Sequence, residues 1–133
     1  MLPHFGVAAA ARSFIIWVLT VMTYCHIIIF MILIGRKIIA DFGVRHPQSR
    51  KPLSAWEEVM RLTDYGSFNE LKLLFRSVDY VYHCYTIFDI RGNKYRLITE
   101  IDYDAGVVQV KRVWTHAEYS MKKNEDALRG GKL

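Results

Sequence analysis

The sequence lacks the residues that several common kinds of site require. It has two cysteines in 133 residues, Cys25 and Cys84, which are too few and too far apart for the disulfide framework of a small secreted domain. His83 precedes Cys84 in a predicted strand, where neighbouring side chains point to opposite faces, so the pair predicts no metal site. The chain has no Walker loop, dinucleotide-binding fingerprint, serine-hydrolase elbow or zinc-protease motif. The sequence therefore implies no cofactor, argues against those enzyme classes and fits a reducing compartment.

Charge is nearly absent from the N-terminal part of the chain. Arg12 is the only Lys or Arg before Arg36, and the first forty residues contain no Asp or Glu. The uncharged range 13–34 would form a helix about 33 Å long, which is enough to cross a hydrocarbon core of about 30 Å. One interpretation is therefore a membrane anchor, with Arg36 and Lys37 keeping the rest of the chain in the cytoplasm. A signal peptide is not favoured, because the small residues of 8–11 precede the apolar run instead of following it.

A second interpretation begins the folded domain at Met31. A methionine followed by the apolar residues 32–34 and by Gly35 is typical of an initiator residue and a short first strand. If the sheet uses that strand, the apolar run left for a bilayer is 14–30, about the shortest length that can span one. We favour this interpretation, in which residues 1–30 are an over-extended start or a dispensable apolar extension. The membrane anchor is the alternative.

The rest of the chain is an ordinary polar mixture with a small basic excess. From Arg36 onward it contains 17 basic and 13 acidic residues, a net charge of +4. A basic domain favours a polyanionic partner, because Lys and Arg release condensed counterions when they contact phosphates. An excess of this size indicates a nucleic-acid partner only weakly.

Two helices are predicted after the first strand. The first ends near His46 and Pro47, because the residue before a proline is pushed out of the helical region. Ser49 is expected to cap the second helix, and Pro52 stands in its first turn. The apolar stripe of this second helix consists of Leu53, Trp56, Val59, Met60 and Leu62.

A third helix and a β-meander follow. Ser67 with Glu70 resembles a capping box for a helix over 68–75. Aromatic and β-branched residues then predict three strands, over 82–90, 94–103 and 107–114, with tight turns at 92–93 and 104–106. A short polar helix from Thr115 and a polar tail over 124–133 close the chain.

These elements predict an α+β fold: an antiparallel β-meander sheet with two to three N-terminal helices on one face. The domain is expected to span 31–123, between the apolar N-terminal extension and the polar C-terminal tail.

Basic and aromatic side chains gather on the predicted meander. Lys94 and Arg96 stand two apart on one strand and so share a face, and Arg112 is on the next strand. His116 and Tyr119 follow the end of that strand. Cleavage of RNA through the ribose 2′-hydroxyl needs a base, an acid and cations for the crowded phosphorane, and this set contains such groups. Exposed basic residues on a strand are more often solvated surface, however, and a lone histidine after a strand is more often structural.

Two sequence stretches identify a family. The range 88–98, FDIRGNKYRLI, resembles the FNIKGNKYRL signature of HigB-type toxins, and 115–119, THAEY, resembles their THAEY signature. The resemblance covers the chain from Met31 to about Lys123. One departure is Asp89, where the family usually has asparagine, and it places an anion beside the cationic strand. Supporting matches are His46-Pro47, Leu53 with Trp56, and Glu70-Leu71-Lys72.

The resemblance implies a small fold of the RelE superfamily and a toxin that cuts mRNA without a metal, generally during translation in the ribosomal A site. It also implies a cognate helix-turn-helix antitoxin of the HigA type and a cytoplasmic location. The residues implied in catalysis are His116, Arg112, Arg96 and Tyr119, and those implied in RNA binding are Lys94, Asn93 and Lys111.

Individual roles follow from the same resemblance. Arg96 and Lys94 would hold phosphate, and Arg112 would stabilise the transition state. His116 would be the acid or the base, and Tyr119 would stack on a base or share in proton transfer. The competing interpretation is a basic module that binds RNA or a protein without cleavage, whether free or tethered to a membrane by 13–34. Asp89 and the unusual N-terminus keep that interpretation open.

Overall fold

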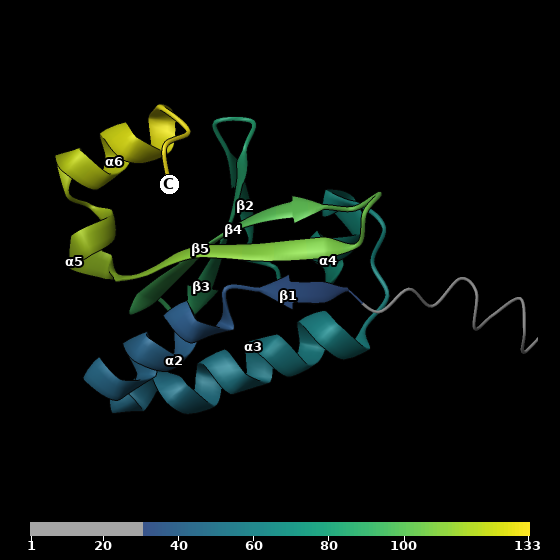
Figure 1. Ribbon diagram of the computed structural model, residues 1–133, viewed down its shortest axis with the longest axis horizontal. Helices are drawn as coiled ribbons and strands as arrows, with labels where there is room; N and C mark the ends of the chain where they lie inside the picture. The colour runs from purple at the N-terminus through teal and green to yellow at the C-terminus, as the bar shows by residue number, and fades with distance from the viewer. Residues whose placement is uncertain (1–30) are drawn as a thin grey trace, which may run out of the picture.

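The computed structural model describes residues 31–133. The interpretations of 1–30, as an extension or as most of a membrane anchor, lie outside the described residues. In chain order the elements are β1 (Ile32–Ile34), α2 (Arg36–Arg45), a 3-10 turn η1 (Pro47–Ser49), α3 (Arg50–Leu62), α4 (Phe68–Leu74), β2 (Asp79–Val81), β3 (Tyr85–Ile90), β4 (Tyr95–Asp102), β5 (Val107–Thr115), α5 (His116–Tyr119) and α6 (Lys122–Arg129) (Figure 1).

Within residues 31–133 the strands form one five-stranded sheet in the order β1-β5-β4-β3-β2. Strands β2 to β5 are antiparallel neighbours, which confirms the predicted meander, and β1 pairs in parallel with β5 at the edge. The short strand predicted after Met31 is therefore confirmed. Because Ile32–Ile34 belong to the sheet, a membrane helix cannot use them as well. No helix within 31–133 has the length and apolarity needed to cross a membrane.

The predicted strand over 82–90 is wrong in its first half. The chain instead makes a hairpin, in which β2 pairs with β3 and Val81 lies opposite Tyr85. Tyr82 and His83 form the turn with positive φ angles of 53° and 55°. Their aromatic side chains favour a strand, but no glycine marks the turn. His83 is consequently a turn residue, and the strand argument used for His83 and Cys84 does not apply.

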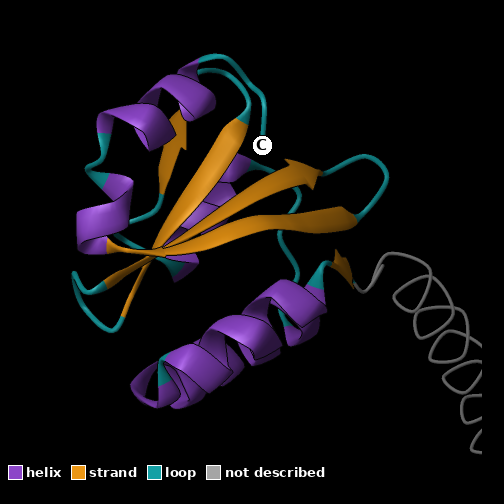
Figure 2. Ribbon diagram, turned by 60° about the vertical axis from the view of Figure 1, so that its left-hand side comes forward, coloured by secondary structure: helices purple, strands orange, loops and turns teal. Residues whose placement is uncertain are grey.

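Helices α2, α3 and α4 pack on one face of the sheet, as predicted (Figures 1 and 2). The ring of Trp56 on α3 meets the ring of Phe88 on β3 edge to face, with centroids 5.3 Å apart. Two details of α3 differ from the prediction. Leu62 is 64% exposed at the end of the helix, and the Ser49 hydroxyl donates to the His46 carbonyl at 2.7 Å instead of capping α3.

The capping residues of α4 are close to the prediction. The Ser67 hydroxyl accepts from the backbone N–H of Glu70 at 3.2 Å. The Glu70 carboxylate accepts from the backbone N–H of Gly66, one residue earlier than the capping-box partner. The helix therefore begins at Phe68, with the Ser67 side chain satisfying one backbone N–H of its first turn.

The C-terminal helices α5 and α6 cover part of the opposite face of the sheet, and the sequence predicted no cover for that face (Figures 1 and 2). The predicted short helix after Thr115 is α5, and Thr115 caps it by accepting from the Glu118 N–H at 3.2 Å. The chain then forms α6, where a polar tail was predicted. Leu128 of α6 is 1% exposed and packs on a second apolar cluster with Tyr85, Ile87, Ile98 and Trp114. One buried leucine in an otherwise polar segment anchors this helix.

Candidate active site

Three segments meet at one end of the sheet, on the face that carries α5 and α6. They are the β3–β4 hairpin at the end of β3 and the start of β4, its turn at 91–94, and α5. Asp89 on β3 lies directly opposite Arg96 on β4, and Arg96 lies opposite Trp114 on β5. The backbone N–H of His116 donates to the carbonyl of Lys94 at 2.8 Å, which ties α5 to the turn. The result is a cluster of Asp89, Asn93, Arg96, His116 and Tyr119, which we call the Arg96 cluster.

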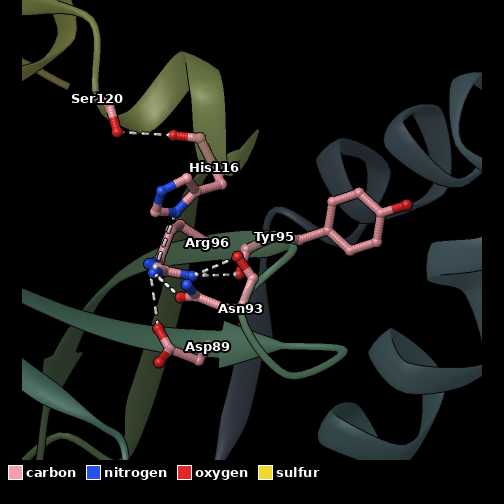
Figure 3. Close-up of polar contacts among 6 residues, drawn as sticks. All are labelled: Asp89, Asn93, Tyr95, Arg96, His116 and Ser120. Atoms are coloured by element: carbon pink, nitrogen blue, oxygen red, sulfur yellow. Dashed lines mark hydrogen bonds and ion pairs between the residues drawn. The ribbon is translucent and has the colours of Figure 1, made fainter.

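Arg96 is the centre of this cluster (Figure 3). Its Nε lies 3.1 Å from Asp89 Oδ1, in an ion pair. Its Nη1 donates to the carbonyls of Asn93 at 3.2 Å and Tyr95 at 3.3 Å. Its Nη2 contacts the Asn93 side-chain oxygen and lies 3.4 Å from His116 Nδ1. Every guanidinium nitrogen therefore has a partner, and the whole residue is only 9% exposed.

His116 lies at the exposed rim of the Arg96 cluster. It is the first residue of α5, and its carbonyl accepts from the Ser120 hydroxyl at 3.0 Å. The side chain is exposed while Nδ1 faces the guanidinium (Figure 3). A histidine fixed on one side and open to solvent on the other can meet a ligand arriving from solution.

Tyr119 covers the guanidinium from α5. The Arg96 Cζ lies 5.5 Å from the centroid of the Tyr119 ring, within the range of a cation–π contact. Burial raises the pKa of Tyr119 above its ordinary value, and the Arg96 charge offsets part of that effect. The phenol is therefore protonated at neutral pH and is a hydrogen-bond donor.

Asp89, a departure from the family signature that was not among the predicted site residues, is also a member of the cluster. Its side chain is 25% exposed, against 11% for that of Arg96. Burial raises the pKa of Asp89, while Arg96 acts in the opposite direction. The carboxylate neutralises the central cation of the cluster, as its position beside the cationic strand led us to expect.

The remaining predicted site residues lie outside the Arg96 cluster. Lys94 is in the turn and not on β4, so the argument that it shares a strand face with Arg96 is wrong. Lys111 Nζ lies 3.5 Å from Glu100 Oε2. Arg112 is exposed, and its Nη1 donates to its neighbour's carbonyl, that of Lys111, at 2.6 Å. The structure thus brings together four of the seven predicted residues: Asn93, Arg96, His116 and Tyr119.

Comparison with known proteins identifies the family. A search of curated proteins finds no match for this chain. The HigB toxin family model, described as a RelE-like toxic component of a toxin-antitoxin system, matches residues 49–122. The match covers more than half of the chain and contains the whole Arg96 cluster, so the resemblance drawn from the two signatures is confirmed. A toxic component of such a system has a cognate antitoxin as its partner. The chain belongs to the HigB toxin family of RelE-like toxins.

Proposed function

We propose that this chain is an endoribonuclease that cuts mRNA during translation and thereby inhibits protein synthesis. The observation that carries the proposal is the exposed His116 ring, whose Nδ1 lies 3.4 Å from the guanidinium of the partly enclosed Arg96. A histidine and a protonated tyrosine beside a fixed cation are the kinds of group that phosphodiester cleavage uses.

The proposed chemistry is cleavage through the ribose 2′-hydroxyl, with no metal required. The 2′-oxygen bonds to phosphorus while the bond from phosphorus to the 5′-oxygen breaks. A base takes the 2′-hydroxyl proton, and an acid gives a proton to the departing 5′-oxygen. The products are a 2′,3′-cyclic phosphate and a 5′-hydroxyl end. The phosphorane carries extra negative charge, which fixed donors and cations stabilise.

The site residues divide into two groups by their surroundings. His116 and Tyr119 would contact the reacting nucleotide, with Tyr119 protonated and able to donate a proton or to stack. Arg112 is the exposed cation that we assign to the transition state. Asn93 and Arg96 contact each other and would set the shape of the site. Lys94 and Lys111 stay as predicted contacts to the RNA backbone.

Membership of the family supports the proposed partners. The substrate would be mRNA held by a translating ribosome, which places the toxin in the cytoplasm. A helix-turn-helix protein would be the cognate antitoxin. The basic excess from Arg36 onward favours association with RNA at low salt.

A second candidate is an RNA-binding module that does not cut. The ion pair between Asp89 and Arg96 favours this candidate, because the Asp89 carboxylate already pairs with the central cation and would compete with a phosphate for it. A module of this kind would associate with ribosomes and leave the mRNA intact.

The test is single-turnover cleavage of mRNA on programmed ribosomes, measured together with association with the same ribosomes. We expect His116→Ala to lose about 10²-fold or more in the cleavage rate, as expected for a group that acts on the reacting atoms. His83→Asn is the matched control, because it removes an exposed histidine from the β2–β3 turn and leaves the Arg96 cluster intact. A wild-type protein that associates but never cuts would establish the module instead.

A further inference from the structure

The contact between Arg96 and His116 restricts the hydrogen positions on the imidazole ring. A guanidinium has five N–H donors, no acceptor, and a permanent positive charge. Any hydrogen bond between Arg96 Nη2 and His116 Nδ1 must therefore use the nitrogen lone pair of His116 as the acceptor. A ring that carries hydrogen on Nδ1, or on both nitrogens, has no lone pair to offer there.

The guanidinium is held in place by its other partners. It therefore determines the hydrogen positions of the His116 ring and does not move to suit the ring. Asp89 pairs with Nε, Asn93 contacts both Nη nitrogens, and the Tyr95 carbonyl accepts from Nη1. These partners come from β3, the β3–β4 turn and β4. Swinging Arg96 away from His116 would break an ion pair and several hydrogen bonds in a site that is largely shielded from water, which is costly.

We infer that Arg96 is a positioning residue that holds His116 as a neutral ring with its hydrogen on Nε2, so that His116 donates a hydrogen bond to RNA and transfers no proton. In this form Nε2 presents N–H toward solvent and Nδ1 is occupied. A neutral imidazole with that hydrogen can stabilise negative charge on a phosphate oxygen, as fixed donors do in other active sites. It has no lone pair left with which to take the 2′-hydroxyl proton.

The inference rests on the proposed function for the role of His116 in cleavage, but the state of the ring can be measured without RNA. The first experiment is nitrogen-15 NMR of the full-length protein, labelled at histidine, at neutral pH. We expect His116 to show an unprotonated Nδ1 and a protonated Nε2. Finding hydrogen on Nδ1, or on both ring nitrogens, would overturn the inference.

Variants of Arg96 test whether this residue causes the hydrogen of His116 to lie on Nε2. Arg96→Met removes the donors. The nitrogen-15 chemical shifts of both ring nitrogens should then move toward the averaged values of an imidazole that exchanges freely between its forms. Arg96→Lys keeps a cationic donor and should restore part of the wild-type pattern. Arg112→Met is the matched control, since it makes the same change of charge on a neighbouring strand and should leave His116 unchanged. If the ring is the same in Arg96→Met as in the wild type, Arg96 does not fix it.

The second experiment separates hydrogen-bond donation from proton transfer. Glutamine places an N–H₂ close to where histidine carries Nε2, but it neither gives nor takes a proton at neutral pH. We expect His116→Gln to cleave within about tenfold of the wild-type rate, and His116→Ala to lose about 10²-fold or more, the usual cost of removing a transition-state donor. If His116→Gln is as slow as His116→Ala, His116 transfers a proton and the inference fails.

The two experiments also distinguish this inference from the function on which it rests. A wild-type protein that cuts no RNA contradicts the proposed function, while the NMR result still decides the state of His116. Cleavage by the wild type combined with a protonated Nδ1 supports the function and removes the role given to Arg96.

Discussion

The two faces of the sheet differ in what they bury, although the same strands supply both. On β3 and β4, Phe88 and Tyr95 point to the face covered by α2 and α3, while their neighbours Asp89 and Arg96 point to the other. The first face is a continuous apolar core. The second combines a small apolar cluster under α6 with the polar Arg96 cluster at one end. Strand alternation thus lets one hairpin supply apolar packing on one face and a polar cluster on the other.

This comparison predicts that substitutions on the two faces separate stability from activity. The largest effect on stability should come from the core face. Phe88→Ala should lower the free energy of unfolding by about 3–5 kcal/mol, because Phe88 is 1% exposed and meets the rings of Trp56 and Phe75 edge to face. Urea unfolding followed by circular dichroism measures the change.

The control for that substitution is an exposed apolar residue. Leu73 is 84% exposed on α4, so Leu73→Ala should change the free energy of unfolding by no more than about 0.5 kcal/mol. A small loss for Phe88→Ala would show that the core assigned to this face does not carry the stability of the domain.

The next effect concerns Arg112, on the polar face. Arg112→Ala should slow single-turnover cleavage by about 10²-fold while ribosome association changes little, because its charge is worth most against the phosphorane. In a binding module the same change should instead weaken association and lower the salt slope of affinity by roughly one. Normal cleavage by Arg112→Ala would show that Arg112 is a solvated surface residue with no part in cleavage.

The third effect is smaller and concerns Asp89. Removing a partly buried charged group usually destabilises a protein, but here we expect no loss of stability. Burial raises the pKa of Asp89, so the ionised carboxylate is disfavoured in the folded protein in spite of Arg96. A carboxyl group whose pKa is raised on folding stabilises the folded protein at a pH below its unfolded pKa. That stabilisation is lost as the pH rises through the folded pKa. Asp89→Asn should therefore be at least as stable as the wild type at pH 7, and that advantage should shrink as the pH falls and Asp89 becomes protonated.

The same variant should also bind RNA more tightly and with a steeper salt dependence, because the cluster gains one net positive charge. Glu100→Gln is the matched control, since it removes a carboxylate paired with Lys111 on the same face and leaves Arg96 unchanged. Thermal unfolding over a pH series and RNA titration at several salt concentrations provide the data. A loss of stability in Asp89→Asn that grows toward neutral pH would contradict this account.

How far the sequence could predict this arrangement depends on how far apart the interacting residues lie along the chain. The pairing of Asp89 with Arg96 is predictable in principle, because the turn around Gly92 sets the register of the β3–β4 hairpin. The approach of His116 is harder to predict, because it follows from the β4–β5 register, which contains an irregularity between Ile98 and Thr99. In that register Tyr95 lies opposite Thr115, and the next backbone contact joins the His116 N–H to the Lys94 carbonyl.

Two features were missed, the first for a local reason and the second because it depends on tertiary packing. The β2–β3 turn places Tyr82 and His83 at positive φ, which non-glycine residues with bulky side chains rarely adopt, so their composition predicted a strand. Helix α6 has a polar sequence, and its docking depends on Leu128 filling a site formed by residues of three strands. Neither feature leaves a glycine-marked turn or an extended apolar stripe in the chain.

The smallest expected effect concerns the part of the chain before the sheet. A fragment starting at Met31 should fold on its own, because it contains every element of both faces that the structure describes. Its circular dichroism spectrum should show the helices and strands of residues 31–133, and its unfolding should be cooperative. An unfolded or insoluble fragment, together with a full-length chain that partitions into membranes, would favour the membrane-anchor interpretation.

The central claim is that the polar face of this HigB-family chain cuts mRNA through a site containing His116. The most direct measurement is a map of RNA 5′ ends after brief induction of the full chain, the His116→Ala variant and the His83→Asn control at matched protein levels. We predict new 5′-hydroxyl ends within translated messages for the wild type and for His83→Asn, and their near absence for His116→Ala. The account would be contradicted by an unchanged RNA map in wild-type cells, or by the same new ends in cells that express a folded His116→Ala protein.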